Sequence, residues 1–179
     1  MLGLKGGKME NKSVKSLTQI ALMVSFLAVV SQLSIPTLLG VPFTIQIFAV
    51  GLIGYLFNTG KSLITVGVYI ALGAVGAPIF ANFGGGLFYL FGYTGGFIWG
   101  FLLLAFLCSL NMGKMKIPLG ILGVIVCHFI GALQYSLIGR IPLFSALIKM
   151  SALYILKDFV LIVLSYFLAK AIKKYVKIN

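Results

Sequence analysis

Carboxylates are the scarcest chemical groups in this sequence. Only Glu10 and Asp158 carry one, and Asp158 follows Lys157 inside the apolar run LYILKDFVLIVLSYF. An ionisable residue inside such a segment is by default a candidate functional residue. The alternative is a lysine that extends out of the apolar layer beside a local carboxylate partner. Because Asp158 is the only acid after residue 10, we favour a functional role for the pair.

Neutral polar residues mark three other hydrophobic runs. The stretch VPFTIQ places Thr44 and Gln46 at the start of one run, and Thr94 interrupts another. Gln134 and Tyr135 stand near the end of a third run. This last pair is equally compatible with helix packing and with the lining of a cavity.

The thiols and the imidazole do not form a catalytic or metal-binding pattern. Cys108 and Cys127 lie in apolar runs without CxxC spacing, so we expect buried, reduced thiols. His128 follows Cys127 directly, and on a helix the two side chains point about 100° apart. We therefore expect His128 to be a packed polar residue, with no metal ion and no cofactor. A membrane enzyme, which needs a base and a nucleophile or a metal cluster, is a poor alternative.

The composition points to lipid as the solvent. The chain has 179 residues, of which 61% are hydrophobic and 9% charged, and its mean hydropathy is +1.15. Soluble domains are about half apolar and a quarter charged. The apolar runs are long and do not alternate, which predicts membrane helices rather than a barrel. The net charge of +12 lies in short flanks, so membrane orientation explains it better than nucleic-acid binding.

Six hydrophobic segments predict an all-α membrane protein with six transmembrane helices. They cover residues 17–34, 43–59, 61–77, 87–110, 117–138 and 147–172. Most of the 14 basic residues fall on the side of the two termini, which places both termini in the cytoplasm of a cell-membrane protein. The expected outer loops cover residues 35–42, 76–86 and 139–146. Residues 1–16 are expected to form a loose polar tail before one domain, residues 17–179, whose first run is a membrane helix rather than a signal peptide.

A glycine-rich stretch, FANFGGGLFYLFGYTGGFIWG, interrupts the middle of the chain. Glycine disfavours an uninterrupted helix, and it lets backbone approach a ligand or another helix. Non-helical backbone at membrane depth is tolerated only when it is buried in protein or faces a cavity. A plain loop with close helix packing and a lid over a pocket are the two interpretations of this stretch.

Several motifs together resemble the BioY family. These are LSIP, VPFTIQ, GAVGAPIF, GGGLFYLFGYTGGFIWGF and the KD pair of the final segment. The resemblance implies the biotin-binding component of an energy-coupling-factor (ECF) vitamin transporter, with six helices and an outward-facing pocket. It implies no catalysis by this chain, and energy from a scaffold subunit with two ATPase subunits. The absence of a GxxxxGK[ST] motif agrees with that division.

The resemblance also implies a ligand site. Biotin offers a ureido ring, an apolar thioether ring and a carboxylate tail, so its site needs a hydrogen-bond acceptor, an apolar slot and a cation. Asp158 or Asn82 could accept hydrogen bonds from the ureido N–H groups, and Lys157 or Arg140 could hold the carboxylate of biotin. The other candidate ligand residues are Thr44, Gln46, Phe83, Gly85, Tyr89, Thr94, Trp99 and Tyr135.

One departure from the family pattern leaves open which basic residue binds the carboxylate of the ligand. Many members carry a lysine three residues after the final aspartate, but this sequence has Leu161 there. Lys157, Arg140 or Lys149 then takes that role, and a related vitamin becomes an alternative ligand. A structural or channel subunit without a small-molecule ligand is a further alternative.

Small residues on the first segment predict a contact with a partner. Ala21, Ser25 and Ala28 fall at i, i+4 and i+7, so they share one helical face. Small residues let another helix approach closely in lipid. The spacing alone fits a contact within this chain equally well. The resemblance favours docking to the scaffold subunit, as in similar substrate-binding components.

Overall fold

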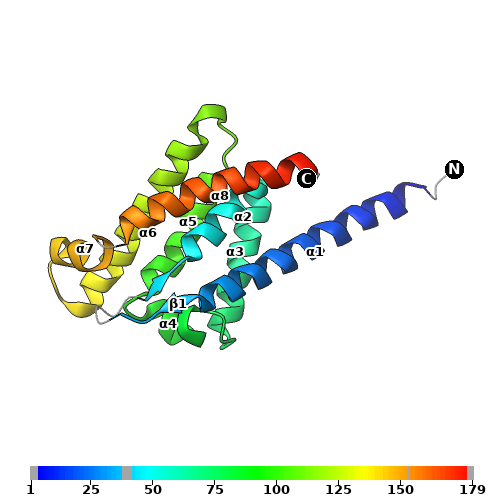
Figure 1. Cartoon of the computed structure of the whole chain (residues 1–179). Coiled ribbons are helices and arrows are strands. Elements are labelled where there is room, and N and C mark those ends of the chain that lie inside the picture. Colours follow the sequence, from blue (N-terminus) through cyan, green and yellow to red (C-terminus); the bar gives the residue numbers. More distant parts are fainter. Residues whose placement is uncertain (1–3, 38–41, 153, 177–179) are drawn as a thin grey trace.

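Helices make up most of the chain in the computed structural model (Figure 1). The structure describes residues 4–37, 42–152 and 154–176, with side chains from residue 13 onward. The α-helices within these ranges are α1 (Leu4–Gln32), α2 (Gln46–Leu56), α3 (Thr59–Ala74), α4 (Leu87–Phe91), α5 (Gly95–Ser109), α6 (Lys116–Gly139), α7 (Leu143–Ser151) and α8 (Ile155–Tyr175). The short elements are the 3₁₀ helices η1 (Ala81–Phe83) and η2 (Gly113–Met115) and the antiparallel strands β1 (Ser34–Ile35) and β2 (Phe43–Thr44).

The core of the bundle is built around α2, which packs against α8, α5, α1 and α3. Every residue of α2 except Phe48 is buried, as expected for a helix that is apolar on all sides. Glycines let the neighbouring helices come close. A Cβ on Gly54 would lie 2.8 Å from the carbonyl oxygen of Ala105, and one on Gly96 would lie 2.5 Å from that of Ile130. Side chains at these two positions would therefore push α5 away from α2 and α6.

The helix lengths agree with a membrane protein. Ser13–Gln32 and Gly113–Gly139 are each long and apolar enough to cross a membrane, and α7 with α8 adds a third span if this pair, bent by 57°, counts as one. Helices α2, α3 and α5 are apolar but shorter. These six units follow the order of the six predicted segments. The chain is thus a mostly helical membrane protein, and the six-span topology stays a prediction.

The prediction of one helix over residues 87–110 is wrong, because the chain breaks at Gly92 between α4 and α5. The amide nitrogen of Gln134 on α6 donates to the carbonyl oxygens of Leu90 (2.9 Å) and Gly92 (2.7 Å). An unpaired carbonyl at a helix end is costly away from water. The side chain of another helix thus stabilises the interruption.

The last segment, predicted over residues 147–172, is also divided. Helix α7 begins at Leu143, inside the predicted outer loop, and Pro142 precedes it as proline commonly does at a helix start. Helix α8 then follows at an angle of 57° to α7. The bend lets both α7 and α8 pack against α6.

The N-terminal part of the chain departs from the prediction in two ways. Helix α1 begins at Leu4, within the segment expected to be a loose tail. Its N-terminal half extends away from the bundle in Figure 1. Strands β1 and β2 form a small hairpin where only loop and helix were expected, with Ser34 opposite Thr44 and Ile35 opposite Phe43.

Candidate functional site

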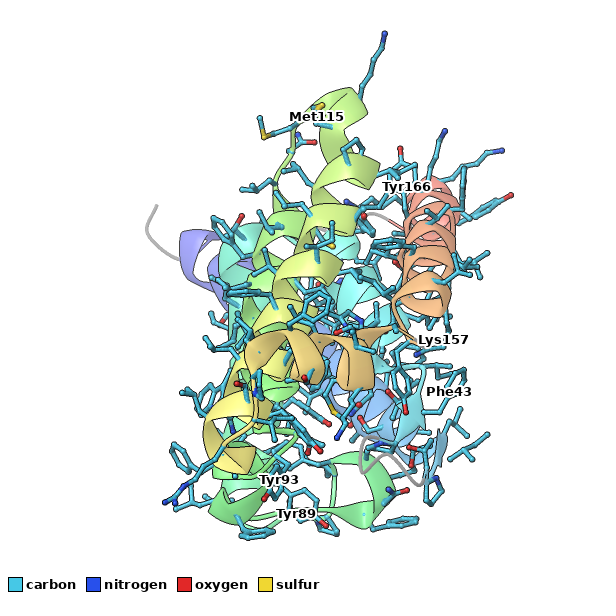
Figure 2. All side chains as sticks on the ribbon, turned by 90° about the vertical axis from the view of Figure 1, so that its left-hand side faces the viewer. Phe43, Tyr89, Tyr93, Met115, Lys157 and Tyr166 are labelled. Atoms are coloured by element: carbon cyan, nitrogen blue, oxygen red, sulfur yellow. The ribbon has the colours of Figure 1, made fainter. Side chains whose placement is uncertain are left out.

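A cavity of about 190 Å³ lies between α2, α5, α6, α7 and α8 and is bordered by β2, η1 and α4. Two of its lining residues, Lys157 and Tyr89, lie in the half of the molecule away from Met115 (Figure 2). Its lining residues are Pro42, Thr44, Gln46, Ile47, Phe80, Ala81, Asn82, Tyr89, Thr94, Phe97, Ile98, Phe101, His128, Met150, Tyr154, Lys157 and Asp158. Most of this wall is apolar or aromatic; its charged side chains, Lys157 and Asp158, come from α8, and α6 adds the imidazole of His128.

Aromatic rings give the cavity a fixed apolar wall. Phe80 is fully buried, and its ring lies 5.5 Å from that of Tyr69 and 6.3 Å from that of Tyr89. Phe97 meets His128 edge-on at 5.6 Å between ring centres. Tilted and edge-on pairs at such distances are favourable beyond their buried area. The rings are therefore held in place before any ligand arrives.

Asp158 is the polar centre of the cavity. It is 4% exposed, and its two oxygens have different partners: Oδ1 accepts from Lys157 Nζ at 2.7 Å, and Oδ2 lies 3.0 Å from His128 Nε2. A carboxylate only accepts hydrogen bonds, so Nε2 carries the histidine proton. In the neutral ring, Nδ1 then accepts from Ser151 Oγ at 3.1 Å. One chain of hydrogen bonds thus joins α6, α7 and α8.

Lys157 ties this centre to the hairpin. Besides Asp158, its ammonium group donates to the carbonyl oxygen of Thr44 at 2.5 Å. It also lies 4.7 Å from the ring centre of Phe43, a cation–π contact that adds to the attraction. Figure 2 shows Lys157 and Phe43 beside each other. The hairpin and α8 are therefore held together by one partly buried cation.

A second hydrogen-bond network supports Gln46 at the cavity wall. The amide nitrogen of Gln46 donates to Ser31 Oγ at 2.9 Å and to Tyr69 Oη at 3.2 Å. The hydroxyl groups of Ser31 and Tyr69 lie 2.8 Å apart, and Tyr69 donates to the carbonyl oxygen of Ile79. These bonds join α1, α2, α3 and the glycine-rich loop. They fix the orientation of the one amide side chain that α2 presents to the cavity.

The glycine-rich loop folds over the end of α1. Asn82 has a left-handed backbone (φ 56°), and its side-chain oxygen accepts from Ser34 Oγ at 2.7 Å. The Gln32 side chain bonds both to the carbonyl oxygen of Phe80 and to the amide of Phe83. Gly85 presses against the preceding turn, where a Cβ would lie 2.5 Å from the Ala77 carbonyl oxygen. The loop is thus a tied, closely packed border of the cavity.

The structure gathers seven of the residues predicted for a ligand site. Those that line the cavity are Thr44, Gln46, Asn82, Tyr89, Thr94, Lys157 and Asp158. They come from six separate elements or loops, so no single motif defines the site. Their role in binding stays a prediction.

The other predicted site residues lie outside the lining. The ring of Phe83 is 71% exposed, and Trp99 donates its ring N–H to the carbonyl oxygen of Leu90 at 3.1 Å. Arg140 is exposed at the end of α6. Tyr135 packs instead against a cluster of Met150 and Tyr154, which do line the cavity. Gly85 takes part through the loop packing described above.

Several lining residues were not predicted. They are Pro42, Ile47, Phe80, Ala81, Phe97, Ile98, Phe101, His128, Met150 and Tyr154. Most are apolar residues in a chain full of apolar residues, and nothing local marks those that face inward. His128 is different, because it is an ionisable group inside a hydrophobic segment, the same signal that identified Asp158. It is packed, as expected, and it also borders the cavity.

Ser151, His128 and Asp158 are the residue types of a hydrolase triad. A nucleophile must reach a bound substrate, and in that chemistry the serine attacks it directly. Ser151 is buried and is not among the residues that line the cavity. The hydrogen-bonded series therefore positions Asp158 and does not provide a nucleophile.

The fold and the cavity define a helical membrane protein that encloses a site for a small molecule. The sequence profile of the BioY family matches residues 7–178. Biotin transporter BioY2 of Lactococcus lactis subsp. cremoris is 37% identical over 133 residues, which cover 74% of this chain and 71% of that protein. The probable biotin transporter BioY of Pyrococcus horikoshii is 34% identical over 65% of this chain and 72% of that protein.

A solved structure shares the fold over almost the whole chain. The crystal structure of the S-component for biotin from an ECF-type ABC transporter superposes with a TM-score of 0.86 and 26% identity, covering 94% of this chain and 95% of that one. The chain belongs to the BioY family, which confirms the resemblance seen in the sequence. BioY is a family of transporters and not of enzymes.

The His128–Asp158 contact predicts a measurable coupling in stability. We expect His128→Ala and Asp158→Ala to be non-additive by about 0.5–3 kcal/mol, because each variant leaves the other residue without its buried partner. Unfolding of the purified single and double variants without ligand measures this coupling. A parallel cycle of Asp158→Ala with Asn82→Ala, which borders the same cavity, serves as the control. Additive effects in the first cycle would contradict the hydrogen bond.

Proposed function

We propose that this chain is the biotin-binding S component of an ECF-type ABC transporter, which captures biotin at the outer face of the cell membrane for ATP-driven uptake. The observation that carries the proposal is the pair of a partly buried Lys157 and a buried Asp158 inside an aromatic cavity, in a chain of the BioY family. A scaffold subunit and two ATPase subunits supply the energy. The relatives named above support biotin rather than a related vitamin.

The Lys157–Asp158 pair binds the ureido group of biotin. Nζ of Lys157 and Oδ1 of Asp158 lie 2.7 Å apart, so the two groups cannot hold opposite ends of an extended ligand. An ammonium group has three donors, and the two bonds described above leave one for the ureido carbonyl. Each Asp158 oxygen has a second lone pair that can accept a ureido N–H. A donor beside an acceptor matches the ureido pattern of a carbonyl beside an N–H.

The remainder of the ligand fits the rest of the lining. Phe80, Phe97 and Met150 supply apolar surface for the thioether ring and the aliphatic tail. The carboxylate then points toward the mouth, where Asn82 is exposed beside the hairpin. Arg140 and Lys149, the other cations considered from the sequence, are exposed and do not line the cavity.

Six crossings with both termini in the cytoplasm complete the proposal. Six apolar helical units support an even count, and the N- and C-terminal ends lie on the same side of the view in Figure 1. The cavity then opens outward, away from the lysine-rich ends. Asn82 and Lys114, both exposed, stand at opposite ends of this arrangement.

The topology is tested by single cysteines at Asn82 and Lys114 in a background without Cys108 and Cys127. An impermeant thiol reagent added to intact cells should label the first position and not the second. Permeabilised cells provide the control, because both positions should then react. Labelling of both positions in intact cells would contradict the six-span topology.

The ligand site is tested by biotin binding to purified variants. Asp158→Asn should weaken binding about 10- to 100-fold, because a hydrogen bond to a charged group contributes about 1.5–3 kcal/mol. Lys157→Met should weaken biotin and its methyl ester by similar factors, because the cation contacts the ureido end. Arg140→Gln, which also removes one positive charge, is the matched control and should bind normally.

Two results would overturn this assignment. If Asp158→Asn folded and bound biotin normally, the Asp158 carboxylate would not be part of the ligand site. The second result concerns a parent protein that binds biotin more tightly than its methyl ester. If Lys157→Met abolished that difference, Lys157 would hold the carboxylate and not the ureido carbonyl.

The partner contact proposed for α1 has support from burial. Leu27 faces the bundle and is fully buried, whereas Ala21 and Ser25 are exposed and Ala28 is half-buried. The exposed pair therefore does not pack within this chain. We assign this face, Ala21, Ser25 and Ala28, to the scaffold subunit.

Tryptophan at both Ala21 and Ser25 tests the docking face. The bulky rings should block the close approach of the partner helix and abolish uptake by cells that carry the complete transporter, while biotin binding by the purified variant is retained. The matched control is Leu22→Trp/Val29→Trp, which places the same two rings on the adjoining exposed stripe of α1. Uptake at the parental rate in the first variant would refute the assignment.

A further inference from the structure

A second cavity lies at the end of the bundle opposite the ligand cavity. Its volume is about 290 Å³, and its lining comes from α2, α6, α8 and the loop that contains η2. Figure 2 shows Tyr166, which lines it, near Met115, whereas Tyr89 and Tyr93 mark the other end. Three lysines line this second cavity: Lys116, Lys170 and Lys173. Biotin capture makes no use of it.

These lysines have no counter-charge among the described residues. In the described part of the chain, Asp158 pairs with Lys157 and His128 at the far end of α8. The other acid, Glu10, is on α1, which packs against α2 and α3. Lys116 and Lys173 line the same cavity, so their like charges repel each other. Like charges held together in a partly desolvated site favour a bound anion.

Two packed tyrosine rings form one wall of this cavity. Tyr55 and Tyr166 pack edge-on with ring centres 5.4 Å apart, and the Tyr55 hydroxyl donates to the carbonyl oxygen of Lys116 at 3.1 Å. Helix α6 continues directly from η2, whose Gly113 carbonyl oxygen accepts the Lys116 amide. The positive charge of this cavity therefore comes from the lysine side chains.

The surroundings of the cavity indicate what kind of anion it holds. Leu164, Phe167 and Leu168 are at least 40% exposed on the turns of α8 that lead to Lys170, and together they offer an apolar surface at membrane depth. A phospholipid has an anionic phosphate next to acyl chains, and basic pockets between membrane helices bind such headgroups. We propose that this second cavity binds the phosphate group of an anionic membrane phospholipid, with Lys116 and Lys173 as its main cations and the acyl chains along α8.

The distance between the two cavities keeps this inference independent of biotin capture. Asp158 and Lys173 stand in the first and last turns of α8, which are separated by roughly 22 Å of helix at 1.5 Å per residue. Substitutions at the lysines therefore leave the proposed ligand site untouched.

The experiment titrates lipids into the full-length protein in detergent and measures bound lipid by native mass spectrometry and the shift in unfolding temperature. Phosphatidylglycerol should bind and stabilise, and phosphatidylcholine should do neither at the same concentration. Lys116→Gln/Lys173→Gln should bind phosphatidylglycerol on the order of tenfold more weakly, because each removed lysine contributed to attraction of the anion. The matched control Lys114→Gln/Lys174→Gln removes the same charge from neighbouring positions outside the cavity and should bind as the parent does.

Four outcomes would overturn the proposal. An equal loss of phosphatidylglycerol binding in both double variants would mean that the overall positive charge of this surface, and not a specific site, attracts the lipid. Equal binding of phosphatidylcholine would remove the role of the anion. Saturation by soluble glycerol phosphate with the same effect as the lipid would assign the site to a free phosphate. If the glutamine variant does not unfold cooperatively, Lys116→Arg/Lys173→Arg keeps the charge, and a tenfold loss in that variant would also contradict the proposal.

Discussion

The structure depends on how one buried carboxylate is satisfied. Asp158 lies in apolar surroundings, where an unpaired charge is unstable and must find partners. It finds Lys157 on its own helix and His128 on α6, and Lys157 in turn binds the backbone of β2. The same contacts that make Asp158 tolerable therefore hold the hairpin, α6 and α8 in fixed relation. The contacts that form the polar centre of the cavity are thus the same contacts that hold these parts of the bundle together.

The broken helices follow from a related constraint. In lipid, a helix can end only where its carbonyl and amide groups find other partners. Gln134 supplies donors at the end of α4, and the Gly86 amide bonds back to the carbonyl oxygen of Gly73 at 2.6 Å. The glycines of this stretch let loop and helices come close enough to make such bonds. The interruption is thus tied into the structure by contacts on α3 and α6, and it forms one border of the cavity.

The sequence predicts the broad architecture better than the site. Apolar runs identify six helical units because hydrophobicity is a local property, and Asp158 stands out because acids are rare in this chain. The break at Gly92 depends on Gln134, about forty residues away, which no local pattern reveals. Phe80 and Phe83 look alike in the sequence, yet one is fully buried at the cavity and the other is 71% exposed. Their difference arises from the left-handed turn at Asn82, a tertiary feature tied to Ser34 on β1.

The satisfied state of Asp158 also limits how the cavity can select a ligand. A site with an unpaired buried group rejects any analogue that fails to bond it, because the analogue leaves that group desolvated. Here both carboxylate oxygens already have partners, so a molecule without a ureido group leaves no charge unpaired. In the proposed binding mode, discrimination at the polar centre then comes from the gain of added bonds to Lys157 and Asp158 and not from a penalty for their absence. In that mode, strong selectivity requires the fixed aromatic wall of Phe80 and Phe97 to exclude molecules of the wrong shape.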